Sequence, residues 1–200
     1  DDLQHMADAG LNRIHVGMET GSDTILKKIK KGITKAGHIK AGLKVKQAGM
    51  ELSEYVMPGL GGIEYSIEHA LETASALNSI NPDFIRIRTL AVTDGTILAE
   101  EAEKGEFEKP TDAMMAKELR LFLESLDGID SYIKSDHILN LFETINGKFP
   151  EDKEKLIGII DGFFNLDPEK RVLYQMGRRM GFFRGPDDMD TSPHLEKVKQ

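Results

Sequence analysis

The strand patterns in the first 95 residues each have one apolar face and one polar face. In residues 13–19, RIHVGME, Ile14, Val16 and Met18 are apolar, whereas the intervening positions carry an arginine, a histidine and, at the end, a glutamate. Helical patterns separate this segment from two further strand patterns. The expected strands are residues 13–19, 52–57 and 84–90, and the expected helices are residues 22–32, 34–49 and 66–80.

This order of elements predicts a parallel sheet, because strands joined by helices at such spacing form right-handed βαβ units. Parallel strands that are covered on both faces usually read as continuous apolar runs, and these do not. We therefore expect helices on one side of the sheet and a polar cavity on the other. A barrel or part-barrel with a ligand in its interior is the simplest fold of this kind.

The pattern becomes mainly helical after residue 96. Further helices are expected from Pro110, around Leu141, over residues 151–164 and over residues 168–180, with a short strand at residues 131–135. The last helix begins with Asp167-Pro168, a favourable cap and first-position pair. The polar stretch after it is expected to be loose.

Composition excludes several kinds of site and partner. The chain has 200 residues, no cysteine and a net charge of −8, so it holds neither disulfides nor a cysteine-ligated metal. The acidic balance disfavours nucleic acid as the main partner, because phosphate binding needs a basic surface. No apolar run approaches the roughly 20 residues of a membrane span, and no secretory leader opens the chain. We expect a cytoplasmic protein without membrane contact.

Glu19 is the first candidate functional residue. It ends an expected parallel strand on its polar parity, at the end of the sheet where ligands bind in α/β folds. An inward carboxylate needs a cation or hydrogen-bond donors, because burying an unpartnered charge is costly. Arg86 and Arg88 share the inward parity two strands on and would serve as partners within the protein. A ligand site and a structural ion pair stay equally open.

A glycine-rich loop, YVMPGLGGIE at residues 55–64, follows the second strand. Gly59, Gly61 and Gly62 would let the backbone approach a ligand closely, although the same residues also suit a tight turn. The loop is expected at the same end of the sheet as Glu19, which favours the ligand. No Ser/His/Asp order or metal-ligand spacing stands out, so no catalytic or metal-binding residue is assigned.

Two stretches resemble the radical S-adenosylmethionine superfamily. GLNRIHVGMETGSDTILKKIKKG (residues 10–32) and AGMELSEYVMPGLGGIEYSIEHA (residues 48–70) resemble the second half of its barrel. The likeness is to the branch with oxygen-independent coproporphyrinogen oxidases, methylthiotransferases and Elongator-type proteins. It implies an α/β fold: half of a partial (β/α)6 TIM-like barrel over residues 1–100, a mostly helical C-terminal extension over residues 110–185 and a flexible tail over residues 186–200.

The resemblance also implies roles for the polar residues. Glu19 matches the position that contacts the amino-acid or ribose part of S-adenosylmethionine, and Lys31 matches a basic residue that pairs with its carboxylate. Relatives often have arginine there, so a bidentate fork would become a point charge. Ser53 or Glu54 would contact the ribose, with the register between them open. The adenine would lie against Gly59, Gly61, Gly62 and Glu64, flanked by the strand that bears Arg86 and Arg88.

One departure from the superfamily is decisive. Its chemistry needs three cysteines, spaced C-x3-C-x2-C, that hold a [4Fe–4S] cluster. This chain has none, lacks patterns for the first three strands and opens inside an apparent helix without an initiator methionine. We interpret it as the C-terminal part of a radical S-adenosylmethionine iron–sulfur oxidoreductase, inactive alone, whose missing N-terminal half is its first partner.

An alternative from another class stays open: a standalone, non-catalytic binding module on a degenerate form of the same fold. In either case, a sheet that lacks its preceding strand exposes a hydrogen-bonding edge and predicts self-association through that edge. The substrate is not indicated by the sequence.

Overall fold

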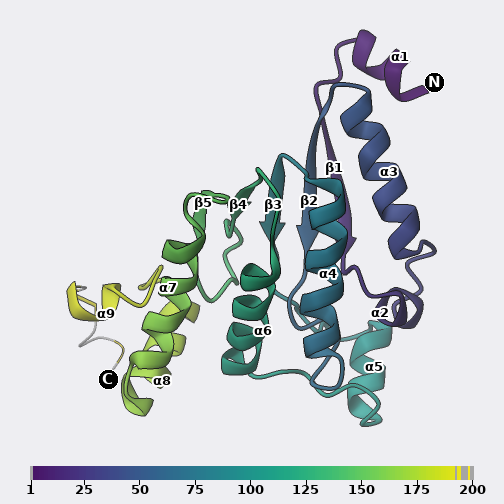
Figure 1. Ribbon diagram of the computed structural model, residues 1–200. Helices are drawn as coiled ribbons and strands as arrows, with labels where there is room; N and C mark the ends of the chain where they lie inside the picture. Colours follow the sequence, from purple (N-terminus) through teal and green to yellow (C-terminus); the bar gives the residue numbers. More distant parts are fainter. Residues whose placement is uncertain (1, 192, 195–197, 199–200) are drawn as a thin grey trace.

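The computed structural model describes residues 2–191, 193–194 and 198. It is an α/β fold built on a five-stranded sheet (Figure 1). The strands are β1 (Arg13–Glu19), β2 (Glu51–Val56), β3 (Phe84–Ile87), β4 (Tyr132–Lys134) and β5 (Asn146–Lys148). The helices are α1 (Asp2–Asp8), α2 (Asp23–Lys28), α3 (Lys35–Gln47), α4 (Ser66–Ile80), α5 (Ile97–Glu103), α6 (Asp112–Ser125), α7 (Lys153–Asn165), α8 (Pro168–Arg179) and α9 (Asp188–Thr191). Within the described part of the chain, none of these helices is long and apolar enough to span a membrane.

The sheet runs in chain order from β1 to β5, and β1 and β5 are its edges. Strands β1 to β4 are parallel, whereas β5 runs antiparallel to β4. The predicted parallel order of the first three strands is confirmed, although β3 ends at Ile87. Beyond it, the Arg88 amide still donates to the carbonyl of Val56. Helices α3, α4, α6 and α7 lie together on one side of the sheet (Figure 1).

Alternation along the strands gives the sheet two different faces, because residues paired in register point the same way. The helix face packs against α3, α4 and α6 and carries the apolar parity, including Leu52, Val56, Ile85, Ile87 and Ile133. The opposite face, the polar face, carries Arg13, His15, Gly17, Ser53, Tyr55, Phe84, Arg86, Tyr132 and Lys134. This separation follows the two parities that the sequence predicts.

Side-chain caps fix several of the expected helix starts, including the predicted cap at Asp167. The side chains of Ser22, Thr34 and Asp167 each accept a hydrogen bond from the backbone N–H three residues on. Ser66, the first residue of the helix expected over residues 66–80, does not cap it. Tyr65 holds the N-cap position of α4, and the Ser66 hydroxyl donates to Glu118 instead.

The second half of the chain is less separate than expected. Strand β4 pairs with β3, and α6 packs on α4, so the sheet and its core continue across residue 100. The helix predicted around Leu141 is wrong: residues 135–145 are irregular, because buried polar side chains hold their backbone in another shape.

The predicted loose tail is packed in part. Asp188–Thr191 form α9, and Met189 is buried in the core together with Val198. Residues 192, 195–197 and 199–200 of this stretch lie outside the described residues.

Candidate functional site

Glu19 and Lys31 meet at the carboxyl end of β1. Glu19 has a positive φ of 64° and follows a bulge that begins after Gly17. Its Oε1 lies 3.5 Å from Lys31 Nζ, and the two side chains are 22% and 31% exposed. A Cβ on Gly17 would lie 2.5 Å from Glu19 Oε1 and 3.4 Å from Lys31 Nζ. The missing side chain at Gly17 therefore leaves the space over the strand, on the polar face, in which this pair lies.

Arg86 and Arg88 do not pair with Glu19, so the ion-pair partner expected for Glu19 is wrong: that partner is Lys31. Arg86 Nη2 lies 3.2 Å and Arg88 Nη1 2.8 Å from the carboxylate of Asp136, just after β4. Burial raises the pKa of Asp136, but the Arg88 hydrogen bond and the charges of both arginines outweigh it and hold the pKa below its usual range. Asp136 is an ion-pair partner that the sequence analysis missed, although it continues the polar parity of β4.

Cation–aromatic stacks extend this cluster across the polar face. The Arg88 guanidinium lies 4.6 Å from the ring centre of Tyr55, and that of Arg13 lies 4.5 Å from that of Phe84. Tyr55 Oη is 3.3 Å from His15 Nδ1. In the register, Tyr55 stands between Gly17 and Arg86, so the polar face is continuous from the Glu19–Lys31 pair to the arginines.

The strand pairing places Ser53 and Glu54 on opposite faces of the sheet. Ser53 is paired with His15 and Phe84 and belongs to the polar face, where its buried Oγ has no hydrogen-bond partner among the described residues. Glu54 is paired with Val16 and Ile85 and therefore belongs to the helix face. Of the two candidates for a ribose contact, only Ser53 is on the face that carries Arg86.

Glu54 is buried at 1% exposure, and its Oε2 lacks a hydrogen-bond partner in the part of the chain that the structure describes. Burial and, to a lesser degree, the charge of Glu19 raise the pKa of Glu54, the charge of Lys31 lowers it, and together they place it at about 8. Near pH 7 the side chain is therefore mostly a neutral carboxylic acid.

The loop glycines are required by packing within the protein. Gly59 and Gly62 have positive φ angles of 89° and 66°. A Cβ on Gly59 would lie 2.9 Å from Met115 Sδ, and one on Gly61 would lie 2.9 Å from Ile25 Cδ1. The Gly59 amide already donates to Glu118 Oε1 at 2.7 Å. These contacts account for the three glycines without a ligand, so their contact with adenine stays a prediction.

A buried network ties the loop and β1 to α6. Glu118 accepts hydrogen bonds from the Gly59 amide and from the Ser66 hydroxyl at 2.5 Å. Its Oε1 is 3.0 Å from His69 Nδ1, and His69 Nε2 is 3.2 Å from the carbonyl oxygen of Glu19. The network positions the backbone of Glu19 from the helix side.

Sequence reasoning missed Glu118 and His69. Position 118 falls between Met115, Leu119 and Phe122 on the apolar stripe of α6. A charge on such a stripe must find partners in the core, and that was the available signal.

No protein-family model matches the chain. Two curated relatives are the tRNA uridine(34) acetyltransferases of Methanocaldococcus jannaschii and Methanocaldococcus infernus, each 29% identical over 126 residues, which are 62% of this chain and 23% of the relative. Among solved structures, the archaeal Methanocaldococcus infernus Elp3 with an N-terminal deletion matches with a TM-score of 0.56 and 25% identity, over 68% of this chain and 33% of that one. The chain thus spans about a quarter of the length of its curated relatives, which are Elp3-type proteins of the radical S-adenosylmethionine superfamily.

Proposed function

We propose that this chain is the C-terminal part of a radical S-adenosylmethionine enzyme and contributes part of its cofactor site. Residues 1–100 would complete a barrel begun by an N-terminal half, with the polar face turned inward. The observation that carries the proposal is the Glu19–Lys31 pair: two opposite, partly exposed charges 3.5 Å apart at the carboxyl end of a parallel strand.

The residues present fit the methionine end of the cofactor. Its ammonium and carboxylate groups are complementary to Glu19 and Lys31, and Gly17 leaves the room in which the pair lies. The Ser53 hydroxyl, buried without a partner among the described residues, would serve the ribose. When bound, the cofactor supplies the sulfonium whose carbon–sulfur bond is cleaved by one electron. The role of this chain is to bind and orient the cofactor.

The iron–sulfur cluster does not fit this chain. Its ligands are thiolates, and the sequence has no cysteine. We therefore derive no radical step from these residues and assign the cluster to the N-terminal half. β1 is an edge strand, so its outer backbone groups would pair with the preceding strand of that half or, in the isolated chain, with a second copy.

The curated relatives are named as enzymes that act on tRNA, and we propose that the longer protein to which this chain would belong also acts on tRNA. The stacks of Arg13 on Phe84 and of Arg88 on Tyr55 support this, since aromatic and guanidinium planes are the surfaces on which unpaired bases stack. The net charge of −8 argues that the main phosphate contacts come from outside this chain.

Titration calorimetry with S-adenosylmethionine tests the cofactor site, first on the chain alone and then on the protein reconstituted with its cluster. We expect weak binding alone, because the cluster iron is absent, and tighter binding after reconstitution. Glu19→Ala and Lys31→Ala should each weaken binding roughly 5- to 100-fold. Glu51→Ala is the matched control, since it removes a 2.6 Å ion pair with Arg13 at the other end of β1 and β2. Unchanged affinity in both site variants would overturn the assignment.

The absence of cysteine specifically favours a second candidate, a binding module without chemistry. The enzyme and the binding module differ in whether adding this chain restores activity to an N-terminal half that carries the cluster. Restoration supports the enzyme, and binding without activity supports the module.

A further inference from the structure

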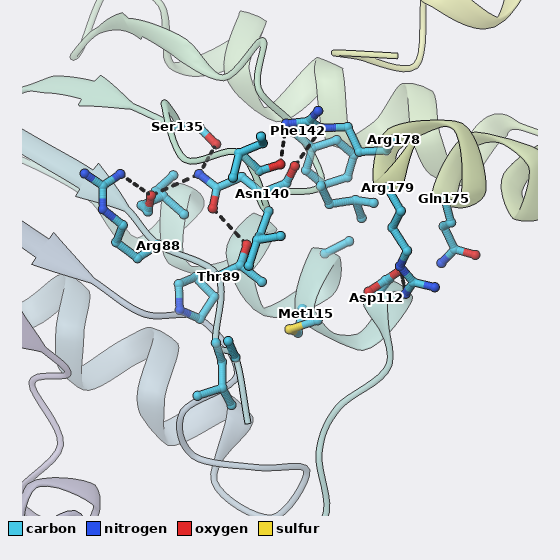
Figure 2. A pocket seen from close by; sticks show the side chains of 18 of the residues that line it. Arg88, Thr89, Asp112, Met115, Ser135, Asn140, Phe142, Gln175, Arg178 and Arg179 are labelled. Carbon is cyan, nitrogen blue, oxygen red and sulfur yellow. Dashed lines mark hydrogen bonds and ion pairs between the residues drawn. The ribbon is translucent and has the colours of Figure 1, made fainter. Parts of the chain in front are cut away.

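A cavity of about 510 Å³ lies away from the Glu19–Lys31 pair. It is walled by residues 87–92 at and beyond the end of β3, by α6, by residues 138–142 and by the end of α8 (Figure 2). We call it the α6–α8 pocket. Its volume is within the range of about 300–1,000 Å³ typical of small-molecule sites. Of the candidate cofactor residues, only Arg88 lines it.

One wall of the pocket is held by two buried polar side chains. Asn140 donates to the carbonyl of Ile87 and to the hydroxyl of Ser135, and it accepts a hydrogen bond from Thr89 (Figure 2). Arg178 donates to the carbonyls of Asn140 and Ile138. An irregular segment with its carbonyls fixed in this way keeps its shape, so the cavity is preformed and does not depend on a ligand to open it.

The interior and the mouth of the pocket are apolar. Met115, Leu119 and Phe142 line the interior. Around it, Ile138 is 78% exposed, and Leu139 and Met180 are 56% and 54% exposed. Large apolar side chains that are exposed together at the mouth of a cavity mark a surface that binds an apolar ligand or partner.

The charges at the pocket are mostly positive. Its lining carries Arg88, Lys109, Arg178 and Arg179 against one carboxylate, Asp112, in a chain whose net charge is −8. Asp136 and Glu143 neutralise Arg88 and Arg178, and Asp112 pairs with Arg179 at 2.7 Å. Lys109 makes no ion pair with any residue that the structure describes, so one positive charge is left at the rim.

We propose that the α6–α8 pocket binds an amphipathic anion, with an apolar chain inside and a carboxylate or phosphate group at Lys109. The apolar walls favour the hydrocarbon chain of the ligand, and the unpaired ammonium group of Lys109 favours an anionic head group. This site does not rest on the proposed function, because it shares only Arg88 with the candidate cofactor residues.

Methyl NMR of the whole chain labelled at its methionines tests the proposal. Met115 and Met180 line the pocket, whereas Met50 is buried in the core and Met6 lies exposed on α1. Octanoate and octyl phosphate are the probes, and octanol and octylammonium are the neutral and cationic comparisons. We expect saturable shifts at Met115 and Met180 only, tighter for the anions than for octanol or octylammonium. Comparison of octanoate with octyl phosphate identifies the preferred head group.

Two charge reversals complete the test. Lys109→Glu should weaken octanoate binding roughly tenfold, because one ionic partner is replaced by a like charge. Lys104→Glu makes the same change at an exposed lysine that does not line the pocket and should leave binding unchanged. Absence of saturable shifts, equal binding of octylammonium, or equal affinity in Lys109→Glu would each overturn the proposal.

Discussion

Two buried carboxylates lie on the helix side of the sheet, and the protein treats them in opposite ways. Glu118 on α6 accepts hydrogen bonds from Gly59 and Ser66 and pairs with His69. Glu54 on β2 is just as buried, but its Oε2 has no hydrogen-bond partner among the described residues, and its pKa is raised to about 8. The Glu118 carboxyl is hydrogen-bonded at both oxygens, whereas the Glu54 carboxyl is mostly a neutral acid near pH 7.

The difference follows from the backbone that each carboxylate faces. Glu118 faces a loop, and the amide of Gly59 is not used in the sheet and is free to donate to it. Glu54 stands in the middle of a strand paired on both sides, where neighbouring amides serve the ladder. A carboxylate on the helix face of a central strand therefore stays protonated unless another side chain donates a hydrogen bond to it. A carboxylate that faces a loop can accept from the loop's free amides and so connect two elements.

The largest effect is expected for Glu118→Ala. It leaves the Gly59 amide, the Ser66 hydroxyl and His69 without their partner, and each buried polar group left unsatisfied in this way costs about 1–3 kcal/mol. Urea unfolding measures the free energy of unfolding. Glu124→Ala, which removes an exposed partner of Arg120 on the same helix, is the control and should cost no more than about 1 kcal/mol. Equal losses of unfolding free energy in the two variants would show that the buried Glu118 stabilises the fold no more than the exposed Glu124 does.

The second effect is a dependence of stability on pH. The Glu54 carboxyl ionises near its ordinary value of 4.5 in the unfolded chain and near about 8 in the folded protein. Between these values the folded state holds a proton that the unfolded state releases, so this group makes the unfolding free energy fall as pH rises. The slope is at most about 1.4 kcal/mol per pH unit.

Urea unfolding across pH 5 to 8 of wild type and Glu54→Gln measures this contribution. The variant should lose the slope and gain stability relative to wild type toward pH 8, because glutamine cannot ionise. The same slope in both proteins would show that Glu54 ionises normally and that its burial is compensated.

The sequence predicted the scaffold better than the partners. Period-two alternation in residues 13–19 fixes which face each side chain joins, and this parity is local. In ELSEYV, parity alone left Ser53 and Glu54 open, because Glu54 interrupts the apolar positions Leu52 and Val56. The pairing of Glu54 with Val16 and Ile85 is what shows that Glu54 belongs to the helix face and Ser53 to the polar face. Register between strands is set by the whole sheet.

Partners that are distant in sequence were beyond local reasoning. Asp136 pairs with both Arg86 and Arg88 because β4 joins the sheet beside β3, and that adjacency depends on the order of the strands. The helix expected around Leu141 is absent because Asn140 and Arg178 bind elsewhere in the fold. Hydrophobic spacing cannot anticipate a tertiary hydrogen bond that overrides helix propensity.

The smallest effect links Glu54 to the candidate cofactor residues. The charge of Glu19 raises the pKa of Glu54, and that of Lys31 lowers it, in both cases less than burial does. Glu19→Gln should therefore lower the pKa of Glu54, and Lys31→Met should raise it. Carbon-13 NMR titration of the Glu54 carboxyl measures both shifts, with Glu51→Gln as the control at the amino end of the same strand. Shifts in the same direction would show that the charges of this pair do not reach Glu54. Opposite shifts would make the Glu54 titration a reporter of the Glu19–Lys31 pair, sensitive to any zwitterion that binds there.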